Sequence, residues 1–145
     1  MLKKTITYTD FNDVEQTEDF YFNLNRAELL DMEAKSNGSL KNKLERLINT
    51  RDLAEIMTLF KDIILNSYGI KSDDGKRFIK SKELSEAFSQ TNAFEELYIE
   101  LSTNTEAAIN FITGIIPAKL ADKLDKDEIE KIKAKANAGT KEITN

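Results

Sequence analysis

Acidic residues near the middle of the chain could hold a metal ion. Asp73 and Asp74 precede Gly75, and Glu83 follows in the same stretch. A helix-loop-helix calcium site needs oxygen ligands at loop positions 1, 3 and 5, glycine at position 6 and a bidentate glutamate at position 12. If Gly75 takes position 6, position 12 falls on Ser81. This register therefore lacks the ligand that matters most.

The second register fails as well, and a turn explains the stretch better. If Glu83 takes position 12, position 6 becomes Arg77. Lys71 and Lys76 add further positive charge, which opposes a divalent cation. Glycine adopts positive φ without steric cost. We therefore expect Gly75 to close a surface turn between core helices, with no metal bound.

Composition removes most catalytic chemistry. The 145 residues include no cysteine and no histidine, which excludes disulfides, thiolate nucleophiles, Cys/His zinc sites and the usual general base. Glu95 and Glu96 could suggest a carboxylate hydrolase, but adjacent helix positions do not face each other. Ser85 and Ser89 have no histidine to activate them. We expect a protein that is not an enzyme and that needs no cofactor.

Charge and hydropathy limit the partners. The formal net charge is −5 and the pI is about 4.9, with lysines and arginines scattered among the acidic residues. A surface that follows a phosphate backbone is not expected, so we expect no nucleic acid partner. No uninterrupted apolar span is long enough to cross a bilayer, so we expect no membrane contact and a soluble cytoplasmic protein.

The N-terminal residues predict an antiparallel β-hairpin. Residues 4–9 alternate between threonine and larger side chains. After a turn-rich segment, residues 15–24 alternate again, and Phe20 and Phe22 face the side opposite to Tyr21. An isolated hairpin is marginal in water, so this one must pack on another part of the protein or pair with another chain.

Helical periodicity replaces this alternation at residue 25. Asn25 and Glu28 form a capping box at the start of the first helix. The longest helix is expected to be central and buried, with Asp52 at its start and Gly69 at its end. Pro117 closes the last core helix. About six helices are predicted, with starts at Asn25, Ser39, Asp52, Ser81, Asn92 and Thr103.

These patterns predict a mostly helical α+β fold, in which an N-terminal antiparallel β-hairpin precedes about six helices. Residues 1–117 should form one globular domain. Residues 118–145 lose the aromatics, and too few large apolar groups remain to offset the entropy of ordering them. We expect a charged, partly helical or disordered tail there. Phenylalanines at strand or helix spacing should fill the core: Phe20, Phe22, Phe60, Phe88, Phe94 and Phe111.

Apolar residues that the core does not need are candidates for partner binding. They are expected on the second face of the hairpin, on the last core helix and along a thin apolar line in the tail. Each could instead belong to the core or to a solvent-exposed helix. The candidates are Tyr21, Ile112, Ile115, Ile116, Leu120, Leu124, Ile129 and Ile132.

Three segments carry a resemblance to a known family. They read "KKTITYTDFNDVEQTEDFYFNLNRAELLDME", "FKDIILNSYGIKSDDGKRFIKSKELSEAFSQTNAFEELYIELS" and "AAINFITGIIP". In this order they resemble the tail assembly chaperones of long-tailed, non-contractile bacteriophages, particularly of those that infect Gram-positive bacteria. The likeness covers roughly residues 3–117 and includes no catalytic signature.

The resemblance implies a role in tail morphogenesis. Such chaperones are small, acidic α+β proteins that bind the long, aggregation-prone tape measure protein, keep it soluble and help tail tube subunits polymerise around it. They act in the cytoplasm of the infected host and are absent from the mature virion. Many have a longer form made by ribosomal frameshifting. The family offers no fixed functional residues. We also expect self-association into a homo-oligomer through the hairpin edge or apolar helix faces.

Three other functions compete with this one. A structural component of the tail, such as a tube, terminator or completion protein, could have the same kind of fold. A small enzyme that uses carboxylates alone and a regulator that binds a host protein are the others.

Overall fold

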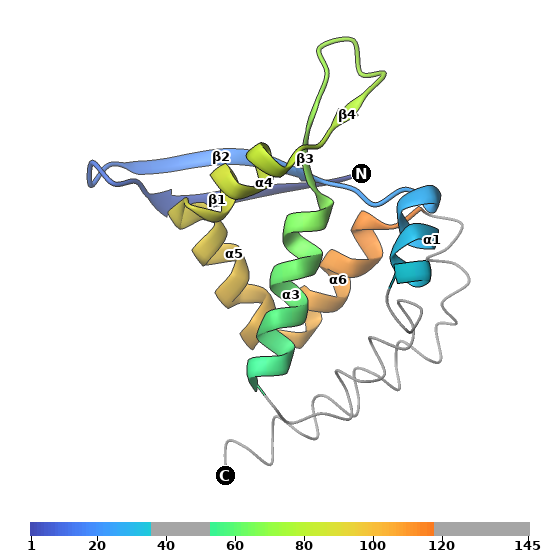
Figure 1. The fold of residues 1–145 in the computed structure, drawn as a ribbon. Coiled ribbons are helices and arrows are strands. Elements are labelled where there is room, and N and C mark those ends of the chain that lie inside the picture. The colour runs from blue at the N-terminus through green and yellow to red at the C-terminus, as the bar shows by residue number, and fades with distance from the viewer. Residues whose placement is uncertain (36–52, 118–145) are drawn as a thin grey trace.

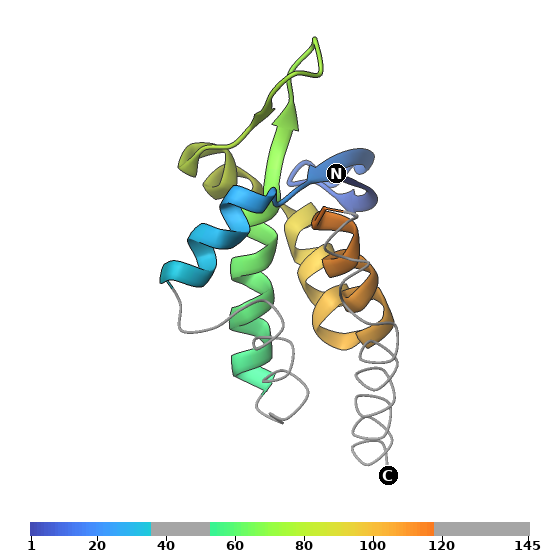
Figure 2. The same ribbon diagram turned by 90° about the vertical axis from the view of Figure 1, so that its right-hand side faces the viewer.

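A four-stranded antiparallel sheet meets one end of a group of helices, and its N-terminal hairpin lies across that end (Figures 1 and 2). The computed structural model describes residues 1–35 and 53–117. The predicted α+β class and N-terminal antiparallel strands are confirmed. The predicted helix starting at Ser39 and the tail beyond residue 117 lie outside the described residues. The described helices are α1 (Arg26–Lys35), α3 (Leu53–Ser67), α4 (Lys82–Ser89), α5 (Asn92–Thr103) and α6 (Thr105–Ile115).

The predicted hairpin is formed by β1 (Leu2–Thr9) and β2 (Glu15–Phe22). All eight residues of each strand pair, from Leu2 with Phe22 to Thr9 with Glu15. Alternation sorts the side chains as predicted, because Phe22 is buried while the threonines of β1 are exposed. The inner face packs on α5 and α6. The hairpin is therefore stabilised by helices, which answers the need for a packing partner.

The sheet has two further strands that the sequence did not predict. Helix α3 passes without a loop into β3 (Tyr68–Lys71), which pairs with β2 and, through a turn, with β4 (Phe78–Ile79). The prediction that Tyr68 belongs to the helix and Gly69 terminates it was wrong. Gly69 pairs with Tyr21 in the sheet. Sequence periodicity could not show this, because the strand is short and its partner is distant in the sequence.

Ser67 explains why helix α3 needs no terminal glycine. Its hydroxyl donates to the carbonyl oxygens of Ile63 at 2.7 Å and Ile64 at 3.1 Å. Its own carbonyl accepts the N–H of Asn23 at 2.8 Å. Carbonyls at a helix end need such partners when they are buried. The helix terminus is thus satisfied by a side chain and by the residue that follows β2.

The turn at Gly75 is confirmed, with φ at 73°. It closes the β3–β4 hairpin, which projects away from the helices (Figure 1). The Asp74 carboxylate accepts the Ser72 hydroxyl at 2.7 Å and the Lys76 N–H at 3.0 Å. The Lys76 N–H and then the Ser72 hydroxyl lower the pKa of Asp74. This carboxylate therefore has a role in shaping the turn.

Two predicted helix caps are shifted by one residue. Ser81 caps α4 as predicted and accepts the Leu84 N–H at 3.0 Å. Helix α5 is capped by Thr91, and α6 by Asn104, in place of Asn92 and Thr103. A neighbouring side chain that can also accept a hydrogen bond makes this position ambiguous in sequence.

The core lies between the inner face of the sheet and helices α3, α4, α5 and α6. Helix α3 buries one face only, since Ile63 and Ile64 are buried while Lys61 and Asp62 are exposed. The prediction of a buried central helix therefore holds for one face of α3 only. The predicted core aromatics are confirmed, because all are buried except Phe20, which packs against the core: Phe20, Phe22, Phe60, Phe88, Phe94 and Phe111.

Replacing Gly69 with alanine should destabilise the sheet. A Cβ at this position would lie 2.7 Å from the Ile79 carbonyl oxygen and 2.7 Å from the Phe78 ring. Overpacking of this kind costs about 1–3 kcal/mol. Urea unfolding should show this loss for Gly69→Ala. The control is Gly75→Asn, which has open space around its Cβ and a residue type that tolerates positive φ. Equal stability of the two variants would contradict the close packing at Gly69.

Candidate interaction surfaces

Several large apolar side chains remain exposed on the described part of the chain. Two of them, Phe11 and Val14, lie in the loop between β1 and β2, which we call the hairpin loop (residues 10–14). Phe11 has the largest exposed fraction of the set, at 78 %. A protein that covers an apolar client needs groups of this kind outside its core. The full set is Met1, Phe11, Val14, Leu30, Ile70 and Ile99.

Hydrogen bonds around Asp10 hold the hairpin loop in one conformation. The Asp10 carboxylate accepts the N–H groups of Asn12 at 2.8 Å and Val14 at 3.0 Å, and the Gln16 amide at 2.9 Å. The Asp10 N–H donates to the Val14 carbonyl at 2.9 Å, and Asp13 adopts φ of 61°. The bond from Gln16, followed by that from Val14, lowers the pKa of Asp10. The loop therefore presents its apolar side chains on an ordered backbone.

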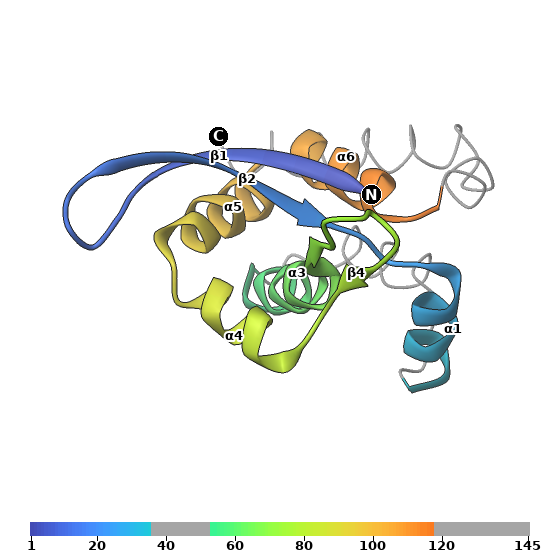
Figure 3. The same ribbon diagram turned by 90° about the horizontal axis from the view of Figure 1, so that it is seen from above.

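The loop end of the hairpin extends past the helices (Figure 3). Near this end, the Asn92 amide donates to the Thr9 carbonyl at 2.9 Å and so connects β1 to the start of α5. Nearer the N-terminus, Lys4 and Glu100 form a salt bridge of 3.1 Å. Within the hairpin, the Tyr8 hydroxyl donates to the Glu18 carboxylate. The hairpin is thus anchored along its length, and only its loop end projects.

Tyr8 should report on this hairpin during a pH titration. Its hydrogen bond to Glu18, with smaller effects of burial and negative charge, raises its pKa to about 12. The raised pKa means that the contact stabilises the fold below pH 10 and is lost as the pH rises toward 12. Ring signals in NMR should show Tyr8 ionising near pH 12, with Tyr8→Phe providing the assignment. Glu18→Gln should lower this pKa, and an unchanged value would contradict the contact.

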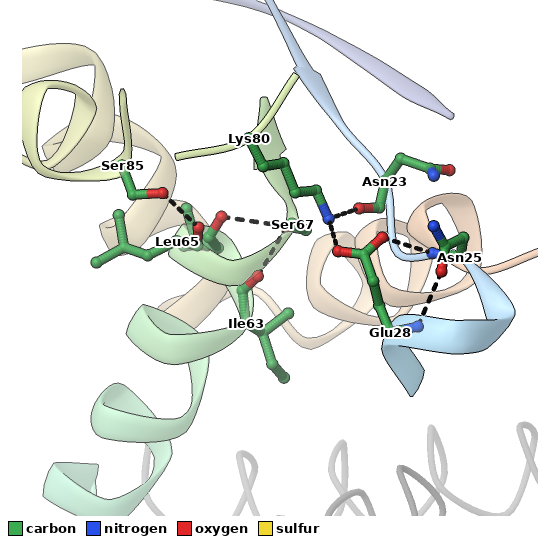
Figure 4. A network of polar contacts seen from close by, with 9 residues as sticks. Asn23, Asn25, Glu28, Ile63, Leu65, Ser67, Lys80 and Ser85 are labelled. Atoms are coloured by element: carbon green, nitrogen blue, oxygen red, sulfur yellow. Dashed lines mark hydrogen bonds and ion pairs between the residues drawn. The ribbon is translucent and has the colours of Figure 1, made fainter. Parts of the chain in front are cut away.

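A polar junction joins the start of α1 to the segment between β4 and α4 (Figure 4). Lys80 donates through Nζ to the Asn23 carbonyl at 2.5 Å and to the Glu28 carboxylate. The same carboxylate closes the predicted capping box, because Glu28 accepts the Asn25 N–H at 3.1 Å and the Asn25 side chain accepts the Glu28 N–H at 2.8 Å. The junction positions α1 and is structural.

The predicted partner-binding residues differ in burial and in whether the structure describes them. Tyr21 is half-buried in β2, where it pairs with Lys3 and Gly69. The three isoleucines of the last core helix and its end are buried, which is the core alternative that the sequence left open: Ile112, Ile115 and Ile116. They therefore provide no exposed surface in this conformation. The tail candidates lie outside the described residues: Leu120, Leu124, Ile129 and Ile132.

Burial of the isoleucines has a backbone cause. The Leu24 N–H donates to the Ile115 carbonyl at 2.7 Å, so the end of α6 is joined to the link between β2 and α1. Leu24 is itself buried in the same core. The apolar surface of α6 that looked surplus in the sequence is covered by this link and by the sheet.

Within residues 1–35 and 53–117, no three acidic side chains are grouped closely enough to hold a metal ion. No helix in these two ranges is both long enough and apolar enough to span a membrane. What the described surface offers is exposed apolar side chains on a hydrogen-bonded loop, which is a geometry suited to binding.

A family model described as "Phage tail assembly chaperone" matches residues 1–145. The chain belongs to this family. Comparison with curated proteins and with solved structures gave no significant match. Membership confirms three expectations, namely a bacteriophage protein, a role in tail assembly and a chaperone. The non-contractile tail and the Gram-positive host stay predictions.

Sequence reasoning missed the exposed residues of this chaperone. Phe11 and Val14 lie in the segment "DFNDV", which the sequence marks as a turn. Turn residues are usually polar, so the phenylalanine in this turn was the feature of the sequence that could have indicated an exposed apolar site. Lys80 was missed for another reason, since its partner Glu28 is 52 residues away and no local pattern connects them.

Replacing Lys80 with methionine should destabilise the chaperone by about 1–3 kcal/mol, because the Asn23 carbonyl and the Glu28 carboxylate lose a charged donor while partly buried. The matched control is Lys82→Met. Its pair with Glu86 spans 3.9 Å between side chains that are 89 % and 61 % exposed, so the expected change is below about 0.5 kcal/mol. Urea unfolding measures both. Similar losses in the two variants would contradict a structural role for the junction.

Proposed function

We propose that this chaperone binds the tape measure protein of its phage, keeps it soluble and helps to recruit tail tube subunits. Family membership supports tail assembly as the setting. The observation that carries the binding proposal is the ordered hairpin loop, which holds Phe11 and Val14 in water. A long helical client exposes apolar side chains until tube subunits surround it, and a chaperone must cover them meanwhile.

The acidic character of the chain suits the same role. A complex that covers apolar surface stays dispersed when its outer surface carries net charge of one sign. The formal net charge of −5 provides this repulsion. We place the activity in the host cytoplasm, before the virion is complete, and we assign it to binding alone, with no chemical reaction.

Self-association is part of the proposal. The strand order is β1-β2-β3-β4, so one edge of β1 pairs with no strand in the described residues. Unpaired strand edges readily accept a strand from another chain. A homo-oligomer would place several client-binding surfaces along one tape measure protein.

Co-expression tests the proposal directly. The tagged chain is produced with overlapping fragments of a cognate tape measure protein, and the soluble, co-purifying client is measured. We expect some fragments to be soluble only when the chaperone is present, and tube protein to join the complex when it is added. Deletion of residues 118–145 shows whether the tail is needed. Light scattering of the same samples should give a mass above that of the monomer.

Two results would oppose this function. One is that no tape measure fragment is retained or kept soluble. The other is that mass spectrometry finds the chain in purified virions at a stoichiometric level, which would favour a structural tail component.

A further inference from the structure

The net negative charge of the chain is concentrated in residues 5–25, whereas the two lysines of the hairpin, Lys3 and Lys4, lie at the end of β1 away from the hairpin loop. Residues 5–25 contain five carboxylates and no lysine or arginine. The formal net charge of the whole chain is also −5, from 26 acidic and 21 basic residues. The remaining residues therefore carry 21 acidic and 21 basic groups, and their formal charges cancel. The hairpin carboxylates belong to Asp10, Asp13, Glu15, Glu18 and Asp19.

Three of these carboxylates lie in the hairpin loop or next to it, and the other two lie farther along β2. The hydrogen bonds they accept come from the hairpin itself, such as those from Gln16 to Asp10, Tyr8 to Glu18 and Thr5 to Asp19. None of the five forms a salt bridge with a lysine or arginine of the described residues. All except Asp10 are exposed. The negative potential around the hairpin loop is therefore available to a partner.

Two exposed apolar side chains lie among these acidic residues. Phe11 is 78 % exposed and Val14 is 51 % exposed, with Asp13 between them in the sequence. The hydrogen bonds to Asp10 already fix the loop backbone. An ordered loop loses little conformational entropy on binding. A projecting aromatic side chain on such a loop is suited to insertion between apolar side chains of a partner.

We infer that the hairpin loop is the anchor for the client, and that it selects cationic amphipathic segments. Such a segment is a helix with an apolar stripe that receives Phe11 and Val14, flanked by lysine or arginine side chains that meet the hairpin carboxylates. This inference rests on the proposed function and adds the chemistry of the client segment and the surface that binds it.

Charge argues against the other occupants. At the loop end of the hairpin a second copy is a poor occupant, because its residues outside 5–25 carry no net charge and its own loop end carries charge of the same sign. Nucleic acid and anionic lipid surfaces are repelled in the same way. A cationic apolar segment is the partner that both features of the loop attract.

Two synthetic peptides test the selection. Both are amphipathic helices with the same apolar residues, one with lysine and one with glutamate on the polar face. Fluorescence anisotropy with the full-length chain should show binding of the lysine peptide that weakens as salt is added, and at least about tenfold weaker binding of the glutamate peptide.

The anchor is tested with matched variants. Phe11→Ser combined with Val14→Ser should weaken binding of the lysine peptide by about tenfold or more, as for truncated hot-spot residues. Leu30→Ser combined with Ile99→Ser is the control, because these side chains are also exposed, by 65 % and 51 %, but lie on α1 and α5. The control should bind like the wild type. Circular dichroism should show that both variants fold, since none of the four side chains is buried.

A charge variant gives an independent measurement. Asp13→Asn with Glu15→Gln keeps the shape of both side chains and removes two charges, and asparagine tolerates the positive φ of position 13. Binding of the lysine peptide should become weaker and less dependent on salt.

The outcomes separate the inference from the proposed function. If the loop variant binds the lysine peptide and solubilises tape measure fragments as the wild type does, the inference is overturned and the chaperone function stands. If both peptides bind equally, the selection by charge is overturned. If the loop variant changes only the oligomeric mass, the loop contacts a second copy and the inference fails. If the wild type solubilises no fragment, the proposed function itself fails.

Discussion

The fold depends on the packing of Phe22, a fully buried ring at the end of β2. Its ring lies 5.1 Å from that of Phe111 in α6, 5.8 Å from Phe88 in α4 and 5.8 Å from Tyr68 at the start of β3, measured between centroids. One side chain therefore joins three segments that are far apart in the sequence. Aromatic pairs in such geometries contribute beyond the area they bury.

Next to this cluster, two backbone hydrogen bonds from adjacent residues join the end of the hairpin to two helices. Asn23 donates to the end of α3 and Leu24 to the end of α6. These two bonds join the base of the hairpin to the ends of both helices. The loop end of the hairpin lies at the opposite end of the two strands and extends past the helices (Figures 1 and 3).

Local patterns were sufficient for much of this architecture. The alternation in β1 and β2, the capping box at Asn25 and the cap at Ser81 depend on residues close in sequence, and the structure has all of them. The direct passage from α3 into β3 could not be predicted from the sequence. It depends on the hydrogen bond from the Ser67 hydroxyl to the Ile63 carbonyl and on pairing of β3 with β2, which is distant in the sequence. The binding surfaces were harder still, since apolar residues of α6 and of the hairpin loop look equally available until the core has been assembled.

The direct continuation of α3 into β3 has a mechanical consequence. Helices usually meet sheets through loops that absorb small displacements. Here Ser67 ends the helix and Tyr68 begins the strand, and Tyr68 is stacked on Phe88 with ring centroids 4.3 Å apart. Figure 1 shows the other end of α3 far from the sheet. Because no loop separates the two elements, a displacement of that end of α3 would also displace β3, the strand that pairs with β2 of the hairpin.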